Sequence, residues 1–99
     1  MNIRIDPEFR DLPGPMDEEA RQTLEASLRA EGCRNALVVW PQPNGTAILL
    51  DGHVRFDICQ RHEIAYSTVN CPDTVTDRES AMTWIMRNLL ARRHTPSQA

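Results

Sequence analysis

The sequence predicts an α/β (α+β) fold, in which several helices pack around one small mixed sheet. Residues 17–31 carry apolar side chains at helical spacing, with acidic residues at the start and a glycine after the end. Two β-rich runs within residues 36–50 are joined by a turn and predict an antiparallel pair. The second run passes directly into a helical pattern over residues 53–63, so strands and helices alternate along one short chain.

Length and composition describe one ordinary domain. The 99 residues are enough for a single hydrophobic core but not for two, so we predict one domain over residues 1–99. No apolar run approaches the roughly 20 residues that span a bilayer, and the start of the chain lacks the apolar stretch of a signal peptide. These observations predict a cytoplasmic protein with no membrane partner.

The charged residues and the cysteines limit the classes of partner and site. The formal net charge is −3, which argues against a surface that binds nucleic acid without specificity. Every basic residue is an arginine, and Arg87, Arg92 and Arg93 crowd the C-terminal end. Arginine suits bidentate phosphate recognition, although genome composition explains the lack of lysine equally well. The three cysteines are far apart, which favours burial over a disulfide or a zinc site.

Residues 1–15 are predicted to be an extended entry to the domain. Ile3 and Ile5 alternate with polar residues and indicate no more than a short edge strand. Four breaker residues then predict the absence of regular structure, namely Pro7, Pro13, Gly14 and Pro15. Glu8 is a lone acid in this segment. We expect it to be solvated, with a position facing the functional site as the alternative.

Local signals bound the central elements. The acidic run Asp17-Glu18-Glu19 favours the start of a helix, and Gly32 is a stop signal. Residues 36–40 are apolar and β-rich, and the dipeptide Asn44-Gly45 predicts a hairpin turn before the return strand. This antiparallel pairing brings Asp51 to one end of the sheet.

The second half of the chain continues the alternation. In the helix over residues 53–63 the apolar side chains fall mainly on one face, and residues 64–69 alternate as in a strand. Thr76 and Glu79 have the spacing of a capping box and predict a last helix over residues 77–91. Its inward stripe is expected to be Ala81, Trp84, Ile85, Asn88 and Leu89. The expected core includes Trp40, Leu49, Ile58, Trp84 and Ile85. Residues 95–98 are typical of another helix start, from which we expect a longer parent protein.

The stretch that points most directly to function is Asp51-Gly52-His53-Val54-Arg55, where a strand gives way to a helix. A glycine there lets the backbone approach a ligand closely. The first turn of the following helix offers unpaired N–H groups and the positive end of the helix dipole, which suit a phosphate. His53 and Arg55 add side-chain donors at the same turn. On spacing alone, a turn glycine followed by a solvated arginine is the better supported interpretation, because turn glycines are common.

Several runs, in order, resemble the N-terminal domain of the ParB family. They are residues 24–32 (Leu-Glu-Ala-Ser-Leu-Arg-Ala-Glu-Gly), Leu37-Val38-Val39-Trp40 and the run from Leu49 to Arg55. The Asp-Gly-His-x-Arg motif is similar to that of ParB-like proteins common on plasmids and phages. The run from Trp84 to Pro96 is also similar to that subgroup, in which an Arg-Arg pair precedes a Thr-Pro helix start. The likeness covers nearly the whole chain.

This resemblance implies the small α/β fold of the ParB/sulfiredoxin superfamily, which binds nucleotides. The superfamily includes partition proteins that bind and hydrolyse CTP, sulfiredoxins, and an ADP-dependent serine kinase. Gly52 matches the glycine that opens the phosphate-binding helix, and Arg55 matches its arginine. Asn88, with Arg92 or Arg93, lies near the place where partition proteins carry a Glu-Asn-x-x-Arg motif for metal and triphosphate. The resemblance therefore favours a phosphate site at Gly52, His53 and Arg55, and a nucleotide ligand (CTP, ATP or ADP) with Mg²⁺ near Asn88.

The sequence also departs from these relatives. Sulfiredoxins carry a cysteine where His53 stands, so their redox chemistry is not expected here. Partition proteins have Glu-Arg-Arg after the glycine, and the loss of the first arginine here puts the CTP switch in doubt. The spacing from Asn88 to the arginine pair is one residue longer than in the partition motif. The kinase branch has a second histidine where Val54 stands, and Glu8 is the nearest match to its upstream catalytic acid.

Three functions remain open at this point. The favoured one is a nucleotide-binding module of a DNA-associated protein in plasmid or phage partition, replication or regulation. Such a module would contact DNA through a C-terminal region beyond these residues, and a homodimer is compatible with it. The second is a stand-alone enzyme, either a serine-kinase-like phosphotransferase or a ParB-like nuclease, with Glu8, Asp51 and His53 as candidate catalytic residues. A nuclease needs clustered carboxylates for metal ions, and only Asp57 follows Asp51 within about one turn. The third is an interaction domain with a vestigial pocket.

Overall fold

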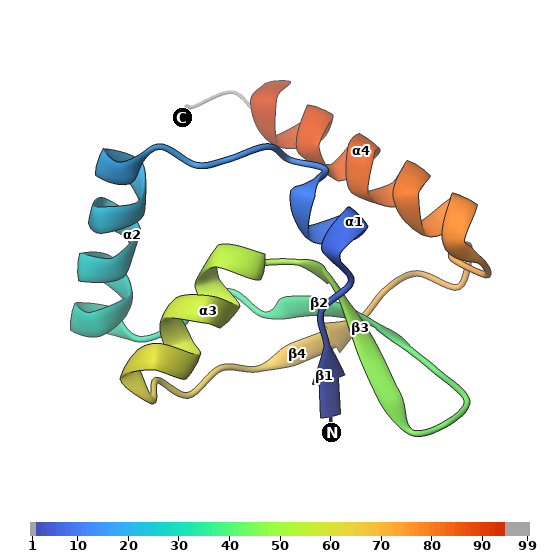
Figure 1. The fold of residues 1–99 in the computed structure, drawn as a ribbon, viewed down its shortest axis with the longest axis horizontal. Coiled ribbons are helices and arrows are strands. Elements are labelled where there is room, and N and C mark those ends of the chain that lie inside the picture. The colour runs from blue at the N-terminus through green and yellow to red at the C-terminus, as the bar shows by residue number, and fades with distance from the viewer. Residues whose placement is uncertain (1, 95–99) are drawn as a thin grey trace.

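The computed structural model describes residues 2–94, which form four helices and four strands around one sheet (Figure 1). In chain order the elements are β1 (Asn2–Arg4), α1 (Pro7–Asp11), α2 (Glu18–Glu31), β2 (Leu37–Pro41), β3 (Thr46–Asp51), α3 (His53–His62), β4 (Thr68–Asn70) and α4 (Arg78–His94). The predicted fold class, an α+β fold with a small mixed sheet, is therefore confirmed. The likeness to the ParB/sulfiredoxin fold in particular stays a prediction.

The hairpin of β2 and β3 lies at the centre of the sheet, whose strand order is β1-β3-β2-β4. β2 and β3 pair antiparallel, as the Asn44-Gly45 turn predicts. The edge strands instead pair parallel, β1 with β3 and β4 with β2. The register of β2 shifts between Val38 and Val39, which pair with Asp51 and Leu49. This bulge lies next to the point where α3 begins.

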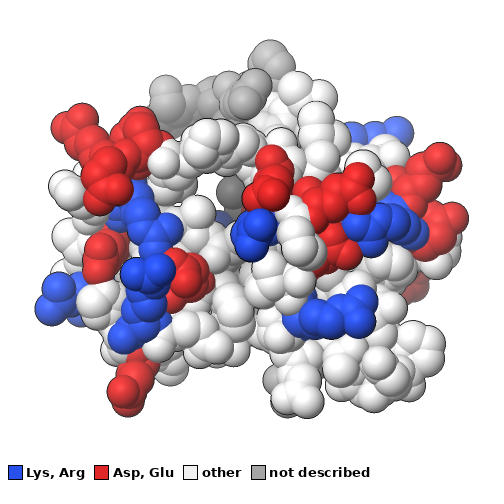
Figure 2. Space-filling view, in the orientation of Figure 1, with Lys and Arg blue, Asp and Glu red and all other residues white. Residues whose placement is uncertain are grey.

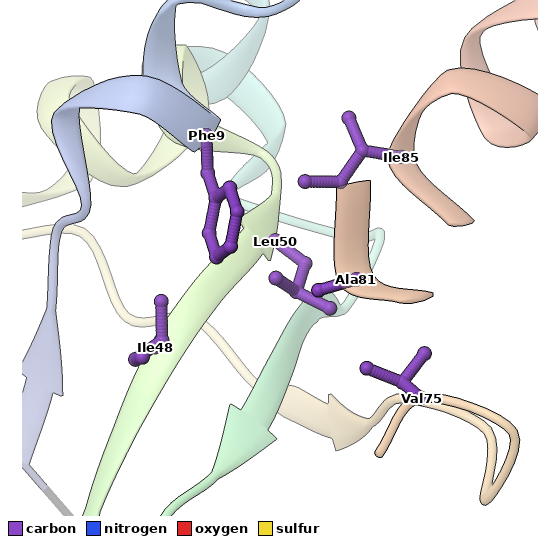
Figure 3. Close-up of a cluster of buried hydrophobic side chains, with 6 residues drawn as sticks. All are labelled: Phe9, Ile48, Leu50, Val75, Ala81 and Ile85. Atoms are coloured by element: carbon purple, nitrogen blue, oxygen red, sulfur yellow. The ribbon is translucent and has the colours of Figure 1, made fainter. Parts of the chain in front are cut away.

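β3 is the centre of the core, because both of its faces are buried. On the face covered by α1 and α4, the buried side chains are Phe9, Ile48, Leu50, Val75, Ala81 and Ile85 (Figure 3). On the other face they are Leu37, Val39, Ala47 and Leu49. Successive strand residues point to opposite faces of a sheet, so a strand covered on both sides needs a continuous apolar run. This requirement explains the sequence Ala-Ile-Leu-Leu at residues 47–50.

The core prediction is confirmed for the three aliphatic residues but not for the two tryptophans. Leu49, Ile58 and Ile85 are buried, as predicted. Trp40 and Trp84 are only half-buried and pack at the border of the cluster under α4. Of the cysteines, Cys59 is buried and the other two are half-buried. Burial raises the pKa of the Cys59 thiol to about 11.

α2 matches its prediction and packs along α3. Its first turn is capped by Asp17, whose carboxylate accepts a hydrogen bond from the N–H of Ala20 at 2.8 Å. Two ion pairs cross between the helices. Arg21 Nη2 lies 2.5 Å from Asp57 Oδ2, and His62 pairs with Glu25.

The prediction for the N-terminal segment is wrong at Pro7, which begins α1 instead of preventing a helix. The first helical position needs no N–H donor, so proline is well tolerated there. Asp6 is the N-cap, and its Oδ1 accepts hydrogen bonds from the N–H groups of Glu8 at 3.0 Å and Phe9 at 3.3 Å. The pair Asp6-Pro7 is thus a helix start signal.

The boundaries of β4 and α4 also differ from the prediction. β4 covers Thr68–Asn70, so the predicted strand over residues 64–69 is correct only at its end. The capping interaction of α4 lies one residue later than predicted, between Asp77 and Ser80. Asp77 Oδ1 accepts from the Ser80 N–H at 2.8 Å, and Ser80 Oγ accepts from the Asp77 N–H at 3.0 Å. Among residues 2–94, no helix combines the length and the apolar character needed to cross a membrane.

Asp6 also joins α1 to the start of α4. Arg78 donates two hydrogen bonds to the Asp6 carboxylate, at 2.8 and 2.9 Å, and its guanidinium carbon lies 4.6 Å from the centre of the Phe9 ring. The bonds from Arg78 lower the pKa of Asp6 from 3.8 to about 2. This junction fixes the N-terminal end of α1, and the chain passes to the candidate site from the opposite end of the helix.

Asp6→Ala is expected to lower the free energy of unfolding by about 2 kcal/mol, because an N-cap and a partly exposed ion pair are lost together. Asp17→Ala removes only a cap and should cost about 1 kcal/mol. Asp6→Asn keeps the cap without the charge and should lie between wild type and Asp6→Ala. The comparison is made by urea unfolding at neutral pH.

The same pair has a predicted pH dependence. Since folding lowers the pKa of Asp6, its contribution is complete above its unfolded pKa of 3.8 and is lost as the pH falls towards 2. The stability difference between wild type and Asp6→Asn should therefore shrink at about pH 3. A difference that stays constant between neutral and acid pH would contradict the ion pair.

Candidate functional site

Gly52 joins β3 to α3 in a backbone conformation that suits glycine. Its φ of 100° and ψ of 29° lie in the left-handed region. A Cβ at this position would lie 2.5 Å from Cδ2 of Leu37, a fully buried side chain. The turn and the packing both require glycine here, whether or not a ligand binds.

The N-terminus of α3 opens onto a cavity of about 410 Å³. The N-cap residue, Gly52, has no side chain to cap this helix end, and the N–H groups of the first turn lack intrahelical partners. The wall of the cavity includes Gly52, His53 and Arg55, together with Asn88 of α4. Figure 2 shows a hollow in this face of the molecule, in the region where Figure 1 places the start of α3. Unpaired N–H groups at the positive end of a helix dipole favour an anion.

His53 is neutral at physiological pH and offers an acceptor. Burial lowers the pKa of its imidazole, and the positive charge of Arg10 lowers it further. The negative charges of Asp51 and Asp11 and a hydrogen bond to the backbone of Leu49 raise this pKa, but by less. Nε2 is shielded from solvent and has no hydrogen-bond partner in the described part of the chain, while the backbone of Leu49 acts on the ring as a hydrogen-bond partner. A neutral imidazole that donates from Nδ1 keeps a lone pair on Nε2. In that tautomer, the donor role that the sequence suggests for His53 would require protonation of Nε2.

Arg55 is held by one long hydrogen bond. Its Nη1 donates to the backbone carbonyl of Asn35 at 3.5 Å, beyond the usual range for such a bond. The described residues provide no ion-pair partner for Arg55, which is half-buried on the cavity wall. The guanidinium is therefore available to a ligand at little cost in protein contacts.

A second cavity, of about 650 Å³, adjoins the first. The segment that joins α1 to α2, residues 13–16, lies over the boundary and contributes Gly14, Pro15 and Met16 to both walls. His53 and Val54 also line both spaces. The second cavity continues along α3, where its wall includes Phe56 and Gln60. An elongated ligand would occupy both spaces beneath residues 13–16.

The charges around these cavities are mostly matched. Arg10 Nε lies 3.0 Å from Asp11 Oδ1, and Arg21 pairs with Asp57 across α2 and α3. On the wall of the smaller cavity, Arg10 and Arg55 stand with the carboxylates Asp17 and Asp51. Within the described part of the chain, Arg55 is the arginine of this wall that makes no ion pair.

The structure brings some of the predicted site residues together and separates others. Asp51 and Asn88 line the same cavity as Gly52. Glu8 lies elsewhere, in a groove that shares no lining residue with this cavity, and its Oε1 is 2.5 Å from Arg78 Nη2. The side chains of Arg92 and Arg93 lie outside the described residues, so their place at the pocket stays a prediction.

Sequence reasoning missed three features of the site. Arg10 and Asn35 come from other parts of the chain, and no local pattern marks them. The segment over the cavities does have a signal, because Pro13-Gly14-Pro15 excludes helix and strand over consecutive residues. Such a segment is a natural candidate for a crossing between two helices.

Among residues 2–94, no group of three or more His, Cys, Asp or Glu side chains is placed to hold a metal ion. No protein-family model matches the chain, and no curated protein or solved structure is similar to it at a significant level. The resemblance to the ParB family therefore rests on the sequence motifs alone.

Proposed function

We propose that this domain is a nucleotide-binding, ParB-like module of a DNA-associated protein that acts in plasmid or phage partition, replication or regulation. One observation carries the proposal, namely that the cavity at the start of α3 is lined by Gly52-His53-Val54-Arg55 and also by Asn88 of the second motif. These residues lie 33 to 36 positions apart in the chain, and a cavity that joins them at a helix N-terminus suits a phosphorylated ligand.

The phosphates would bind at the first turn of α3. Backbone N–H groups would donate to the phosphate oxygens, and the half-buried guanidinium of Arg55 would exchange its long bond to Asn35 for a bidentate contact. Nε2 of His53 would accept a hydrogen bond from a hydroxyl or amine of the same ligand. The ribose and base would extend into the larger cavity, where Phe56 supplies an aromatic surface.

Mg²⁺, where it accompanies a nucleoside triphosphate or diphosphate, is usually held by one or two carboxylates and by the phosphates. Asn88, Asp17 and Asp51 line the cavity wall, and their side chains carry oxygen donors of the kind that such an ion takes. When bound, Mg²⁺ would neutralise part of the phosphate charge. The protein residues would then fix its position.

The alternative of a stand-alone enzyme has less support. A serine-kinase-like phosphotransferase needs a catalytic acid upstream, and Glu8 is instead bound to Arg78 in a separate groove. Asp51 and His53 line the cavity, but the third candidate catalytic residue, Glu8, does not stand with them. Binding is therefore the function that the geometry favours, with DNA contacts and any homodimer made outside this cavity.

A binding screen with ATP, ADP, CTP and GTP, each with and without Mg²⁺, tests the proposal by isothermal titration calorimetry. At least one nucleotide should bind, and its nucleoside without phosphates should bind much more weakly. Saturation at 100 times the Kd should add about 2.7 kcal/mol to the free energy of unfolding. No heat and no thermal shift with any of the four nucleotides would contradict the proposal.

The isolated domain is expected to bind duplex DNA weakly. Its net charge is −3, and Figure 2 shows acidic and basic side chains interspersed over this face, without a continuous basic surface. A gel-shift assay with a random-sequence duplex library at physiological salt should leave most of the DNA unbound. Tight binding of any duplex by these 99 residues would place the DNA contact inside the domain instead.

A further inference from the structure

A groove of about 690 Å³ lies where α4 begins beside α1, and no function has been attached to it. Its lining residues are Glu8, Arg78, Glu79, Met82, Thr83 and Met86. None of them lines the cavities at the start of α3, so the groove is a separate feature.

The floor of the groove is apolar and consists of methionine side chains. Met82 and Met86 are one turn apart on α4, and Leu90 continues the same line beyond the groove. Met82 packs against the core cluster, whereas Met86 is 44% exposed and Leu90 is 51% exposed, so the outer part of this stripe is uncovered within the described part of the chain. From Met82 to Leu90 the stripe is about 12 Å long, the length of two turns of a facing helix. Methionine adapts its shape to different partners and is common on surfaces that bind amphipathic helices.

The rim of the groove is acidic. Arg78 is held by Asp6 and by Glu8, at 2.8 Å and 2.5 Å, so its charge is already matched inside the protein. Among the residues that line the groove, Glu8 and Glu79 stand against one guanidinium, which leaves a formal charge of −1 (two negative, one positive), and Asp6 adds a carboxylate behind Arg78. Figure 2 shows acidic side chains gathered around basic ones on the side where Figure 1 places α1 and the start of α4.

We propose that this groove is a docking site for a basic amphipathic helix of another protein. Apolar side chains at helical spacing would cover Met82, Met86 and Leu90, and lysine or arginine side chains would face Glu8 and Glu79. Helix-in-groove binding of this kind uses anchors at positions i, i+3 or i+4, and i+7. The charge complementarity selects the basic partner, because an acidic helix would meet like charges at the rim.

A second copy of this chain fits the groove less well. In a two-fold contact the same surface meets itself, so the acidic rim of one copy would face the acidic rim of the other. The formal charge of −3 on each copy adds to that repulsion. The groove therefore favours a different, basic partner.

The test uses a synthetic amphipathic peptide of 14 residues, with leucine at helical spacing and lysine elsewhere, and a twin with glutamate in place of lysine. Fluorescence anisotropy with the 99-residue chain should show the lysine peptide binding at least about ten-fold more tightly than the glutamate peptide. Met86→Ser should weaken the lysine peptide by about ten-fold, because it removes an apolar anchor. Glu79→Gln should weaken it by about two- to five-fold.

Two control variants outside the groove test whether the peptide binds at the groove. Val69→Ser changes an equally exposed apolar residue on the edge strand β4, and Glu31→Gln removes one exposed charge from α2. Neither should alter the affinity, and circular dichroism should show all variants folded. The proposal is overturned by equal binding of both peptides, by no binding, or by a Val69→Ser effect as large as that of Met86→Ser. Sedimentation of the free chain as a dimer that Met86→Ser dissociates would assign the groove to a second copy instead.

Discussion

Arg55→Ala is expected to weaken nucleotide binding by about ten- to a hundred-fold, because a charge-assisted bidentate contact is lost at the phosphate. The fold should remain intact. Within the described structure, Arg55 makes one hydrogen bond, at 3.5 Å, and no ion pair, so its removal should cost well under about 1 kcal/mol in stability. The measurement is calorimetric titration of wild type and variant with the best nucleotide from the screen.

Arg29→Ala is the matched control for this experiment. Arg29 is an exposed arginine of α2 that lines neither cavity, so its loss changes the net charge equally without touching the site. The control should bind the nucleotide like wild type. If both variants bind equally well, Arg55 is not a phosphate ligand. If Arg55→Ala fails to fold in a thermal melt, its role is structural and the phosphate site loses its main support.

Gly52→Ala is expected to destabilise the domain by about 2–3 kcal/mol, the sum of two costs. A non-glycine residue at φ 100° is strained, and the new Cβ would lie 2.5 Å from Cδ2 of Leu37. Leu37 is fully buried, so its side chain has little room to yield. For a chain of about this length, such a change lowers the Tm by roughly 8 to 24 °C. Differential scanning calorimetry measures the shift directly.

Gly45→Ala separates the two costs. Gly45 also has a positive φ, of 90°, but no atom lies within 4 Å of the place where its Cβ would stand. The expected loss there is about 1 kcal/mol, from backbone strain alone. In a double-mutant cycle, Leu37→Ala should reduce the additional cost of Gly52→Ala, since the obstructing side chain is gone. Equal losses at the two glycines would show that the contact with Leu37 is unimportant.

Gly52 and His53 illustrate how much of the candidate site could be predicted from the sequence. The pattern Asp-Gly-His-x-Arg at a strand-to-helix junction correctly predicted that Gly52 opens a helix, because the change of hydrophobic period is a local signal. It did not reveal that packing against Leu37 already demands a glycine. The protonation state of His53 was also beyond local reasoning, since it depends on burial and on the charges of Arg10 and Asp11.

Capping signals had a similar limit. Asp17 and Gly32 bounded α2 correctly, because caps satisfy backbone groups of the same helix. At residues 6–7 the same kind of signal was present but was outweighed by the general rule that proline interrupts helices. At the start of α4 the capping box was found one residue out of register, at Thr76 in place of Asp77. Several polar residues in a row offer more than one cap, and only the packing of the following helix selects among them.

The sequence by itself determined the elements near the centre of this protein, since hydrophobic period, turn dipeptides and helix ends are properties of neighbouring residues. Only the tertiary structure decided which of these elements meet. β1 pairs with β3 across more than 40 residues, and Arg78 reaches Asp6 across 72 positions. The cavity that joins Gly52 to Asn88, and the segment 13–16 that covers it, depend on the same long-range packing. Contacts between distant residues carry no local pattern, because their geometry depends on the order of strands in the sheet and on the shape of the core between them.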